Sequence, residues 1–490
     1  MTQPTAVDFK NQGNKALLES KYEEAIELYT KAINLDSTNA VFFANRAQAH
    51  IKSEAYGSAI ADASEAIKLD PSYTKAYYRR AVAKTAIVRY KDALPDFKVT
   101  VDRAPNDKDA KARYLECQKI VRRLAFEKAI EVEDEPSVAE TLDIRSLKVE
   151  DSYDGPELDI EFVKEADSDK FFPKVNMTKE FITQTIERFK VGKLLPRKYL
   201  YAIVLQAMKL FQQEPTMVEI KAEMPDHLIT ICGDTHGQFF DLLEIFRKNG
   251  EPSENHMYLF NGDFVDRGSW SCEIALTLYA YKILYPSSFF INRGNHETDS
   301  MNKVYGFEGE CKHKYVSESV FKLFSESFSL LPLATLVSDQ YFVVHGGLFS
   351  DDNVTLDDIR KFNRFSEKQP GMHGIMMEML WTDPQPEPGR GPSKRGIGIQ
   401  FGPDVTDRFC KANGLKAVIR SHEVRMGGYS EEHDGKLITV FSAPNYCDSQ
   451  GNKGAYINVR EDGELNFVTF DAVPHPDIKP MRYASQLMGM

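Results

Sequence analysis

The chain has 490 residues and carries 61 Lys and Arg against 73 Asp and Glu, a formal net charge of −12. Its length favours two to four domains, and 42% hydrophobic residues is enough for ordinary globular cores. The negative charge argues against binding nucleic acid without regard to sequence.

The N-terminus and the cysteines indicate a reducing compartment. The start, MTQPTAVDFKNQ, has neither the basic nor the apolar region of a secretory signal. No run approaches eighteen apolar residues, so we expect no membrane-spanning helix. The six cysteines are scattered and none forms C-x-x-C, which favours buried thiols over a disulfide scaffold or a zinc ribbon.

The first part of the chain repeats with a period of 34 residues. The equivalent positions are Tyr22, Tyr56 and Tyr90; Ala25, Ala59 and Ala93; Gly13, Ala47 and Ala81; and Ser37, Pro71 and Pro105. Small residues at fixed positions with Pro closing the unit are the signature of tetratricopeptide repeats. We predict three repeats plus a capping helix over residues 6–130, stacked into a solenoid with a concave face.

Five first-helix residues are predicted to line that concave groove, two amides and three cations. They are Lys10, Asn14, Asn45, Lys75 and Arg79. Positions 10 and 14 share one helix face, as do 75 and 79. Such a set suits a C-terminal carboxylate with acidic side chains around it. The alternative is that the cations are merely solubilising.

An acidic connection follows the repeats. Residues 131–170 hold fifteen Asp or Glu against four Lys or Arg. We predict an acidic linker over 131–150 and a second domain over 151–490. The linker is read as a solvated spacer, with a regulatory docking strip as the alternative.

The second domain is organised around three blocks that follow apolar, strand-like runs: GDTHG from Gly233, GDFVDRG from Gly262 and RGNHE from Arg293. Helix-like segments, 239–248 and 273–284, lie between them. In strand–loop–helix folds the chemistry sits at the carboxyl ends of the strands, so three loops can converge. Two more strand-like runs end in His345 and His422.

Asp, His and Asn in these loops are ligand types for Mn, Fe or Zn. Asp234 and His236 are two apart in an extended loop, and Asp263 can bridge two ions. Two ions about 3.5–4 Å apart suit in-line displacement at phosphorus by an activated water. His296, next to Asn295, is the candidate proton donor.

GDTHG, GDFVDRG, RGNHE, HGG and RSHE together resemble the Ser/Thr phosphoprotein phosphatase family of metallophosphoesterases. The resemblance implies two divalent or trivalent metal ions (Mn, Fe, Zn or Mg) and hydrolysis of phosphoserine and phosphothreonine in proteins. It implies an α/β domain with a central β-sandwich flanked by helices, following the all-α solenoid. The site residues it implies are metal ligands Asp234, His236, Asp263, Asn295, His345 and His422; the acid His296 with Asp266 behind it; and phosphate contacts Arg267, Arg395 and Tyr446. We place Tyr446 on a hairpin loop over the site.

A repeat array N-terminal to such a phosphatase is similar to one subtype of the family. The five groove residues are similar to the carboxylate clamp of co-chaperone repeats, which implies binding of the acidic C-terminal tail of heat-shock protein 90, and sometimes of heat-shock protein 70. The resemblance to the subtype implies lipid activators, a location in cytoplasm and nucleus, and autoinhibition by the repeats. A C-terminal helix around Ala484 to Met488 would hold the closed state, with Glu54 mimicking phosphate.

Two other readings stay open: a phosphodiesterase with the same metal core, and a scaffold whose second domain is silent. An assay on a phosphopeptide beside bis-nitrophenyl phosphate separates the first from a protein phosphatase.

Overall fold

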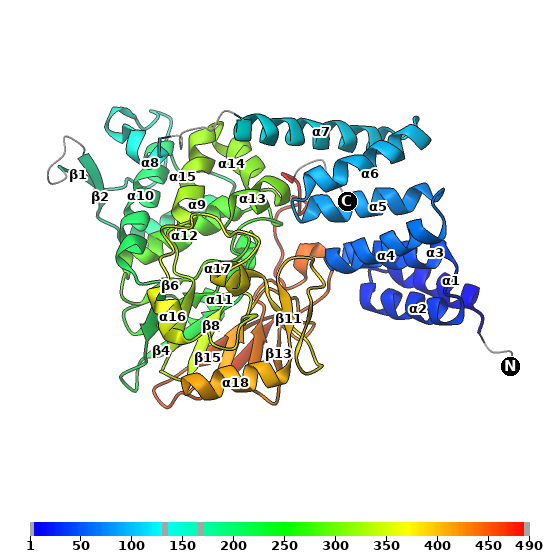
Figure 1. The fold of residues 1–490 in the computed structure, drawn as a ribbon. Helices are drawn as coiled ribbons and strands as arrows, with labels where there is room; N and C mark the ends of the chain where they lie inside the picture. Colours follow the sequence, from blue (N-terminus) through cyan, green and yellow to red (C-terminus); the bar gives the residue numbers. More distant parts are fainter. Residues whose placement is uncertain (1–3, 130–135, 165–170, 485–490) are drawn as a thin grey trace. The chain divides into compact units, whose positions relative to one another are not determined.

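The computed structural model describes residues 4–129, 136–164 and 171–484. These residues fall into two compact units, which are described separately (Figure 1). The helical unit consists of the described residues in the ranges 1–135 and 392–398. The sandwich unit consists of those in the ranges 136–391 and 399–484. The predicted linker lies partly outside the described residues, because 130–135 are not among them.

The helical unit is a run of helices that pack side by side in sequence order (Figure 1). Its helices are α1 Ala6–Leu18, α2 Tyr22–Leu35, α3 Ala40–Lys52, α4 Tyr56–Leu69, α5 Thr74–Ala86, α6 Tyr90–Arg103 and α7 Lys108–Ala129. The period of 34 appears in the backbone too. Ser20, Glu54 and Val88, each between the two helices of a repeat, have φ of 59°, 62° and 63°. The three predicted repeats and their final helix are therefore present as helix pairs followed by α7.

Small side chains let these helices approach closely. Ala25, Ala59 and Ala93 are fully buried. At Gly13 an added Cβ would lie only 2.8 Å from the Tyr29 ring. Close packing at these positions explains why the repeated positions in the sequence are occupied by Ala and Gly.

The sandwich unit holds two packed β-sheets. The first has the strand order β16-β15-β4-β5-β6 and the second the order β13-β14-β12-β8-β7-β3. The strands of the first are β4 Leu228–Cys232, β5 His256–Phe260, β6 Phe289–Ile291, β15 Gly454–Val459 and β16 Leu465–Phe470. Those of the second are β3 Met217–Ile220, β7 Ala334–Val337, β8 Tyr341–Val344, β12 Ala417–Arg420, β13 Tyr429–Glu432 and β14 Leu437–Val440.

The two sheets share one core and helices cover their outer faces. Ile229 and Ile231 of β4 meet Val343 of β8 and Ile419 of β12 in a cluster between the sheets. In the first sheet, Cys232 of β4 and Phe260 of β5 point the other way, into a core made with α10 Arg197–Gln213, α12 Ser271–Leu284 and α15 Glu318–Phe328. In the second sheet, the Phe342 ring of β8 packs against the ring of Phe409 instead. Strands buried on both faces explain the near-continuous apolar runs of the sequence. The predicted fold, a central sandwich flanked by helices after an all-α solenoid, is confirmed.

The helices of this unit include the two predicted segments, 239–248 and 273–284. They are α8 Val138–Thr141, α9 Lys179–Lys190, α10 Arg197–Gln213, α11 Phe239–Asn249, α12 Ser271–Leu284, α13 Asp299–Tyr305, α14 Phe307–Tyr315, α15 Glu318–Phe328, α16 Leu356–Lys361, α17 Ile375–Trp381 and α18 Pro403–Asn413. Two short 3₁₀ turns, η1 Ile144–Ser146 and η2 Tyr446–Asp448, complete them. The remaining strands are β1 Ile160–Lys164, paired with β2 Phe171–Val175, and β9 Asp383–Pro384, β10 Arg390–Pro392 and β11 Ile399–Phe401, which form a small sheet.

The prediction of a hairpin at Tyr446 is wrong. The loop that carries Tyr446 runs from β14 to β15, and these strands belong to different sheets. The chain therefore crosses from one sheet to the other here. The predicted C-terminal helix around Ala484 to Met488 falls almost wholly outside the described residues.

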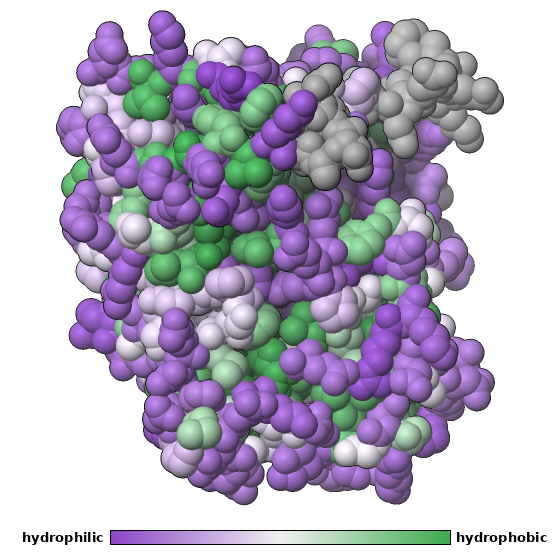
Figure 2. Space-filling view, turned by 90° about the vertical axis from the view of Figure 1, so that its left-hand side faces the viewer, coloured by the Kyte–Doolittle hydropathy of each residue, from purple (hydrophilic) through white to green (hydrophobic). Residues whose placement is uncertain are grey.

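Polar residues dominate the visible surface. On the face shown in Figure 2, hydrophobic residues appear mostly between hydrophilic ones. Within the described ranges, no helix combines the length and apolar character needed to cross a membrane.

Candidate metal centre

The six predicted metal ligands all follow the carboxyl ends of sandwich strands. Asp234 and His236 follow β4, Asp263 follows β5, Asn295 follows β6, His345 follows β8 and His422 follows β12. Since β4, β5 and β6 are parallel, as are β8 and β12, each sheet delivers its ligands to one edge. All six side chains are buried.

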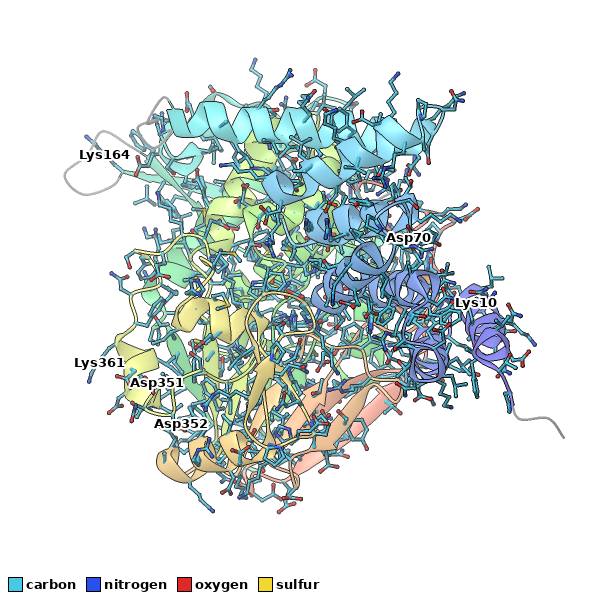
Figure 3. All side chains as sticks on the ribbon, turned by 45° about the vertical axis from the view of Figure 1, so that its right-hand side comes forward. Lys10, Asp70, Lys164, Asp351, Asp352 and Lys361 are labelled. Atoms are coloured by element: carbon cyan, nitrogen blue, oxygen red, sulfur yellow. The ribbon has the colours of Figure 1, made fainter. Side chains whose placement is uncertain are left out.

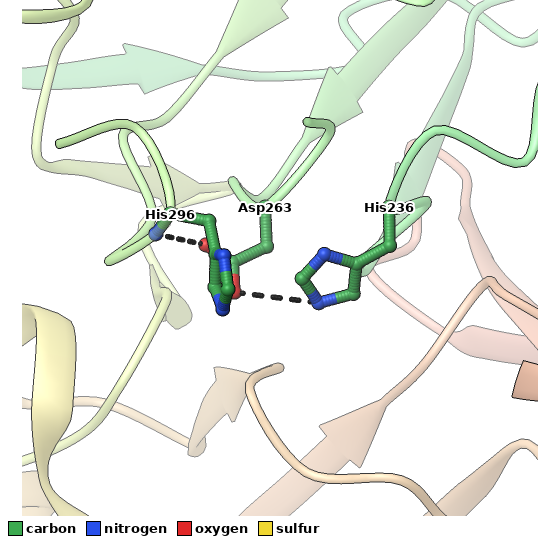
Figure 4. A group of neighbouring side chains, drawn as sticks. All are labelled: His236, Asp263 and His296. Carbon is green, nitrogen blue, oxygen red and sulfur yellow. Dashed lines mark hydrogen bonds and ion pairs between the residues drawn. The ribbon is translucent and has the colours of Figure 1, made fainter. Parts of the chain in front are cut away.

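One group forms around His236. Its Nε2 lies 3.6 Å from Asp234 Oδ2 and 3.6 Å from Asp263 Oδ2. Figure 4 shows His236 and His296 on either side of Asp263. Metal bonds of about 2.1 Å place neighbouring ligand atoms roughly 3.0–3.5 Å apart. Asp234, His236 and Asp263 therefore have the spacing of one ligand set.

A second group forms around His345. Its Nε2 lies 2.9 Å from Asn295 Oδ1, 3.2 Å from His422 Nδ1 and 3.2 Å from Asp263 Oδ2. Asp263 Oδ2 thus faces both groups, which is the position of a bridging carboxylate. The structure brings all six predicted ligands together.

Hydrogen bonds fix which imidazole nitrogen faces each group. His236 Nδ1 lies 3.0 Å from the Val265 carbonyl, and His345 Nδ1 lies 2.8 Å from the Asn261 carbonyl. A carbonyl can only accept, so Nδ1 carries a proton in both rings, and in the neutral form of each ring Nε2 is left as an electron-pair donor. This is the tautomer that a metal ligand requires.

The charges of the cluster favour cations. Burial opposes protonation of His345, but Asp263 and Asp234 raise its pKa to about 9. Burial would raise the pKa of Asp263, yet His345 and His296 hold it well below its usual range. Buried carboxylates that attract protons this strongly also attract metal ions. Two Asp, three His and one Asn fit two ions of the Mn, Fe or Zn type.

The predicted acid, His296, lies beside the cluster and is held by Asp266. Its Nδ1 is 2.8 Å from Asp266 Oδ2. Its backbone N–H donates to Asp263 Oδ1 at 2.8 Å, a contact drawn in Figure 4. Asn302 also donates to Asp266 Oδ2, at 2.9 Å. His296 therefore presents Nε2 while its other nitrogen is fixed by a buried carboxylate.

The predicted phosphate contacts divide between the two units. Arg267 is buried, and its guanidinium carbon lies 3.9 Å from the centre of the Tyr305 ring. The Tyr446 ring is 5.2 Å from the His236 ring. Arg395 belongs to the segment 392–398, which falls in the helical unit.

Several site residues have backbone conformations that non-glycine residues rarely adopt. The φ angles are 42° at His236, 50° at Asp263, 69° at Asp266, 68° at Arg267 and 70° at His422. Left-handed residues of this kind persist where the surrounding structure over-determines them, often at functional sites. Their concentration in these loops indicates that the backbone is held in an unfavourable conformation in order to place the side chains of the site.

Sequence reasoning missed the residues that hold these loops. Glu297 Oε2 accepts from the N–H of Asp263 at 2.7 Å and of Gly294 at 2.8 Å. Asn302 donates to both Asp266 and the His296 carbonyl. Glu297 lies within the RGNHE block, so the sequence indicated that it is near the site but not that it binds these backbone N–H groups. No motif pointed to Asn302.

In the helical unit, three of the five predicted groove residues form a chain. Asn14 Oδ1 accepts from Asn45 Nδ2 at 3.2 Å, and Asn45 Oδ1 accepts from Arg79 Nη1 at 3.2 Å. Tyr29, which was not predicted, donates to Asn14 at 2.8 Å. Lys10 projects from α1 (Figure 3).

The groove cations have no acidic partner. Among the residues that the structure describes, no carboxylate pairs with Lys10, Lys75 or Arg79. By contrast, Arg46 pairs with Asp62 and Arg80 with Asp96, each at 2.7 Å. Burial lowers the pKa of Arg79, as expected for a cation without a neutralising partner.

Comparison with known proteins gives consistent matches over the chain. Family models match as Calcineurin-like phosphoesterase over residues 227–426, PPP5 TPR repeat region over 114–219 and TPR repeat over 13–54. Serine/threonine-protein phosphatase T of Schizosaccharomyces pombe is 58% identical over 484 residues, 99% of each chain. Serine/threonine-protein phosphatase 5 of Homo sapiens is 47% identical, covering 99% of this chain and 94% of that protein.

A solved structure agrees. It is described as a protein serine/threonine phosphatase from Saccharomyces cerevisiae with similarity to human phosphatase PP5. It matches with a TM-score of 0.60 and 55% identity over 63% of this chain and 100% of that one.

Proposed function

Because the chain belongs to the serine/threonine-protein phosphatase 5/T family, and is therefore a serine/threonine-protein phosphatase, we propose the roles of its site residues as follows. Asp234, His236 and Asp263 hold one metal ion. Asp263, Asn295, His345 and His422 hold a second. When bound, these ions supply Lewis acidity at phosphorus and a water activated for attack.

The side chains of the protein do the rest. His296 donates a proton from Nε2 to the leaving oxygen of the serine or threonine. Asp266 fixes Nδ1 of that ring and stabilises its charged form. Arg267 places a guanidinium beside the site for the phosphoryl oxygens, and Tyr446 offers a hydroxyl. Arg395 is proposed as a further phosphate contact on its motif alone.

The observation that carries this proposal is the contact of His296 with both Asp266 and Asp263. Through these two contacts Asp266 holds the His296 ring, and the His296 backbone is tied to Asp263, the bridging carboxylate of the cluster. The test is metal content by mass spectrometry beside turnover of a phosphoserine peptide and of bis-nitrophenyl phosphate. We expect about two metal ions per chain, and turnover of the phosphopeptide far above that of the diester.

His296→Asn should keep the metal and lose at least about a hundredfold in turnover. Unchanged turnover would favour a silent sandwich unit with a scaffolding role. Faster turnover of the diester would favour a phosphodiesterase.

We further propose that the groove of the helical unit binds the acidic C-terminal tail of heat-shock protein 90. Three cations that have no acidic partner among the described residues, together with the Asn14–Asn45–Arg79 chain, support it. A charge-assisted hydrogen bond contributes about 1.5–3 kcal/mol, so Arg79→Ala should weaken binding of an MEEVD-like peptide at least about tenfold by calorimetry. Lys91→Ala, an exposed change outside the chain of bonds, is the control. If Arg79→Ala and wild type bind the peptide with equal affinity, the groove is not the peptide-binding site.

Autoinhibition by the repeats is part of the same proposal. The support is that a peptide-binding array and a phosphatase share one chain. Deleting residues 1–130 should raise turnover of a small phosphoester several-fold, and a groove peptide or a fatty acid should activate only the full chain. Unchanged turnover after the deletion would remove the idea.

We also propose that the protein works in the cytoplasm and nucleus. All six cysteines have free thiols, as expected in a reducing compartment.

A further inference from the structure

The last described segment of the chain, residues 471–484, is tied to the loop that carries Arg267. The backbone N–H of Met481 donates to the Arg267 carbonyl at 2.7 Å. The hydroxyl of Ser269 donates to the Lys479 carbonyl at 3.0 Å. This tail segment therefore contacts a predicted phosphate-binding loop directly.

His475, within the same segment, makes two hydrogen bonds at once. Its Nδ1 lies 2.8 Å from the Pro476 carbonyl and its Nε2 lies 3.0 Å from Asp448 Oδ1. Both partners are acceptors, so both ring nitrogens must donate, which only the imidazolium can do. The ring also packs edge-on against Trp270, with centroids 5.2 Å apart.

Asp448 ends the short turn that carries Tyr446. The φ angles of Asn445, Cys447 and Asp448 are 43°, 53° and 54°, all in the left-handed region. Such a run of non-glycine residues is unfavourable and needs external support. Tyr446 sits within this turn, buried against the ring of His236.

We propose that His475 is a positioning residue that holds the Tyr446 turn in place through Asp448. The inference rests on the proposed phosphate contact of Tyr446. Because the same segment binds the Arg267 carbonyl, the tail supports both of the phosphate contacts of the sandwich unit. When the pair of His475 and Asp448 is lost, the turn is free to relax and Tyr446 moves from its position.

The charged groups that face His475 are Asp448 from the turn and Asp241 from α11. Partial burial opposes protonation of His475, but the Pro476 carbonyl, Asp448 and Asp241 together raise its pKa above the ordinary value. The imidazolium and its two bonds are therefore fully present below the ordinary pKa of about 6.5. They are lost as the pH rises through the raised value.

The experiment measures kcat and KM of the full-length, metal-loaded protein on a phosphoserine peptide between pH 6 and 9. His475→Asn keeps a donor near Nδ1 and loses the arm that reaches Asp448. Asp448→Asn removes the charge of the partner. The matched control is His433→Asn, since His433 also makes two hydrogen bonds, to Thr406 and to the Gln385 carbonyl. Its φ of 50° is one that Asn tolerates.

We expect His475→Asn to lower kcat/KM about three- to tenfold at pH 6.5, mainly through KM, and the difference from wild type to close by pH 9. Asp448→Asn should give the same loss, and the double variant no more than either single one. The control should stay within about twofold of wild type throughout.

A ratio of wild type to His475→Asn that is constant with pH, or losses that multiply in the double variant, would overturn the inference. Tyr446→Phe separates it from the proposed function. If Tyr446→Phe is impaired and His475→Asn is not, only the role of His475 fails. If Tyr446→Phe matches wild type, the phosphate contact fails and the inference with it.

Discussion

The pairing of His296 with Asp266 allows a sharp prediction for Asp266→Asn. Asp266 Oδ2 accepts from His296 Nδ1 at 2.8 Å and from Asn302 at 2.9 Å, while Oδ1 accepts from the Phe307 N–H at 2.8 Å. An amide has one accepting oxygen and one donating nitrogen. If the oxygen keeps Phe307, the new N–H₂ group faces two donors, and the negative charge beside His296 is gone.

The size of the effect follows from the bond that is lost. A hydrogen bond to a charged group contributes about 1.5–3 kcal/mol. At about 1.4 kcal/mol per factor of ten, loss of that stabilisation in the transition state lowers kcat roughly 10- to 150-fold. The substitution affects the proton donor, so the loss in kcat should be larger for a leaving group that is more basic and depends more on protonation.

Two substrates with different leaving groups can measure that dependence. The serine alkoxide is a poor leaving group and p-nitrophenolate is a good one, so the loss should be larger on a phosphoserine peptide than on p-nitrophenyl phosphate. Asp299→Asn, an exposed change at a residue paired with Lys303, should match wild type on both. Metal content should be unchanged. Equal losses on the two substrates, or no loss on either, would refute the assignment of His296 as the acid.

Three further predictions concern the metal centre and stability. At Gly294 an added Cβ would lie 2.2 Å from Asp263 Oδ1, so Gly294→Ala should reduce metal content and cut turnover at least about a hundredfold. Gly371→Ala should do neither, since an added Cβ there would come no closer than 3.8 Å to the His373 backbone. Arg46→Met removes the guanidinium from the buried Asp62 carboxylate and leaves only His50 beside it, at 3.6 Å. The variant should lower the free energy of unfolding of the repeats by about 3 kcal/mol in urea titrations followed by circular dichroism, and no loss would contradict this. Burial lowers the pKa of His256 to about 4, so stability should be lost as pH falls from about 6.5 toward 4, and His256→Gln should lose about 1 kcal/mol less between pH 7 and 5 in thermal melts. A parallel pH dependence in wild type and variant would contradict that assignment.

Local patterns were enough to predict two helices and the strand ends at which the candidate ligands lie. The segments 239–248 and 273–284 correspond to α11 and α12, because their apolar residues recur at helical spacing. The candidate ligands could be picked out because each follows a buried strand, and parallel strands bring their carboxyl ends to one edge. The repeat period was readable because close helix packing restricts the same positions to small residues in every unit.

Residues that support the site through hydrogen bonds to residues far along the chain left no comparable signal. Asn302 reaches Asp266 from α13, a contact between positions 36 apart that depends on the tertiary fold. Tyr446 was placed on a hairpin because two apolar runs flank it, but those runs enter different sheets. Flanking hydrophobicity reports that a strand is buried and carries no information about which sheet it joins.

The same limit applies to the His475–Asp448 pair. Either residue, read alone near the end of the chain, is an ordinary polar residue in a loop. Their meaning comes from the left-handed turn between Asn445 and Asp448, whose conformation no local motif of Gly or Pro announces. Backbone strain at non-glycine residues is invisible in a sequence, because it is maintained by partners far along the chain. In a site of this kind, the sequence pattern indicates the candidate metal ligands, whereas the residues that hold the loops in place are found only from the three-dimensional structure.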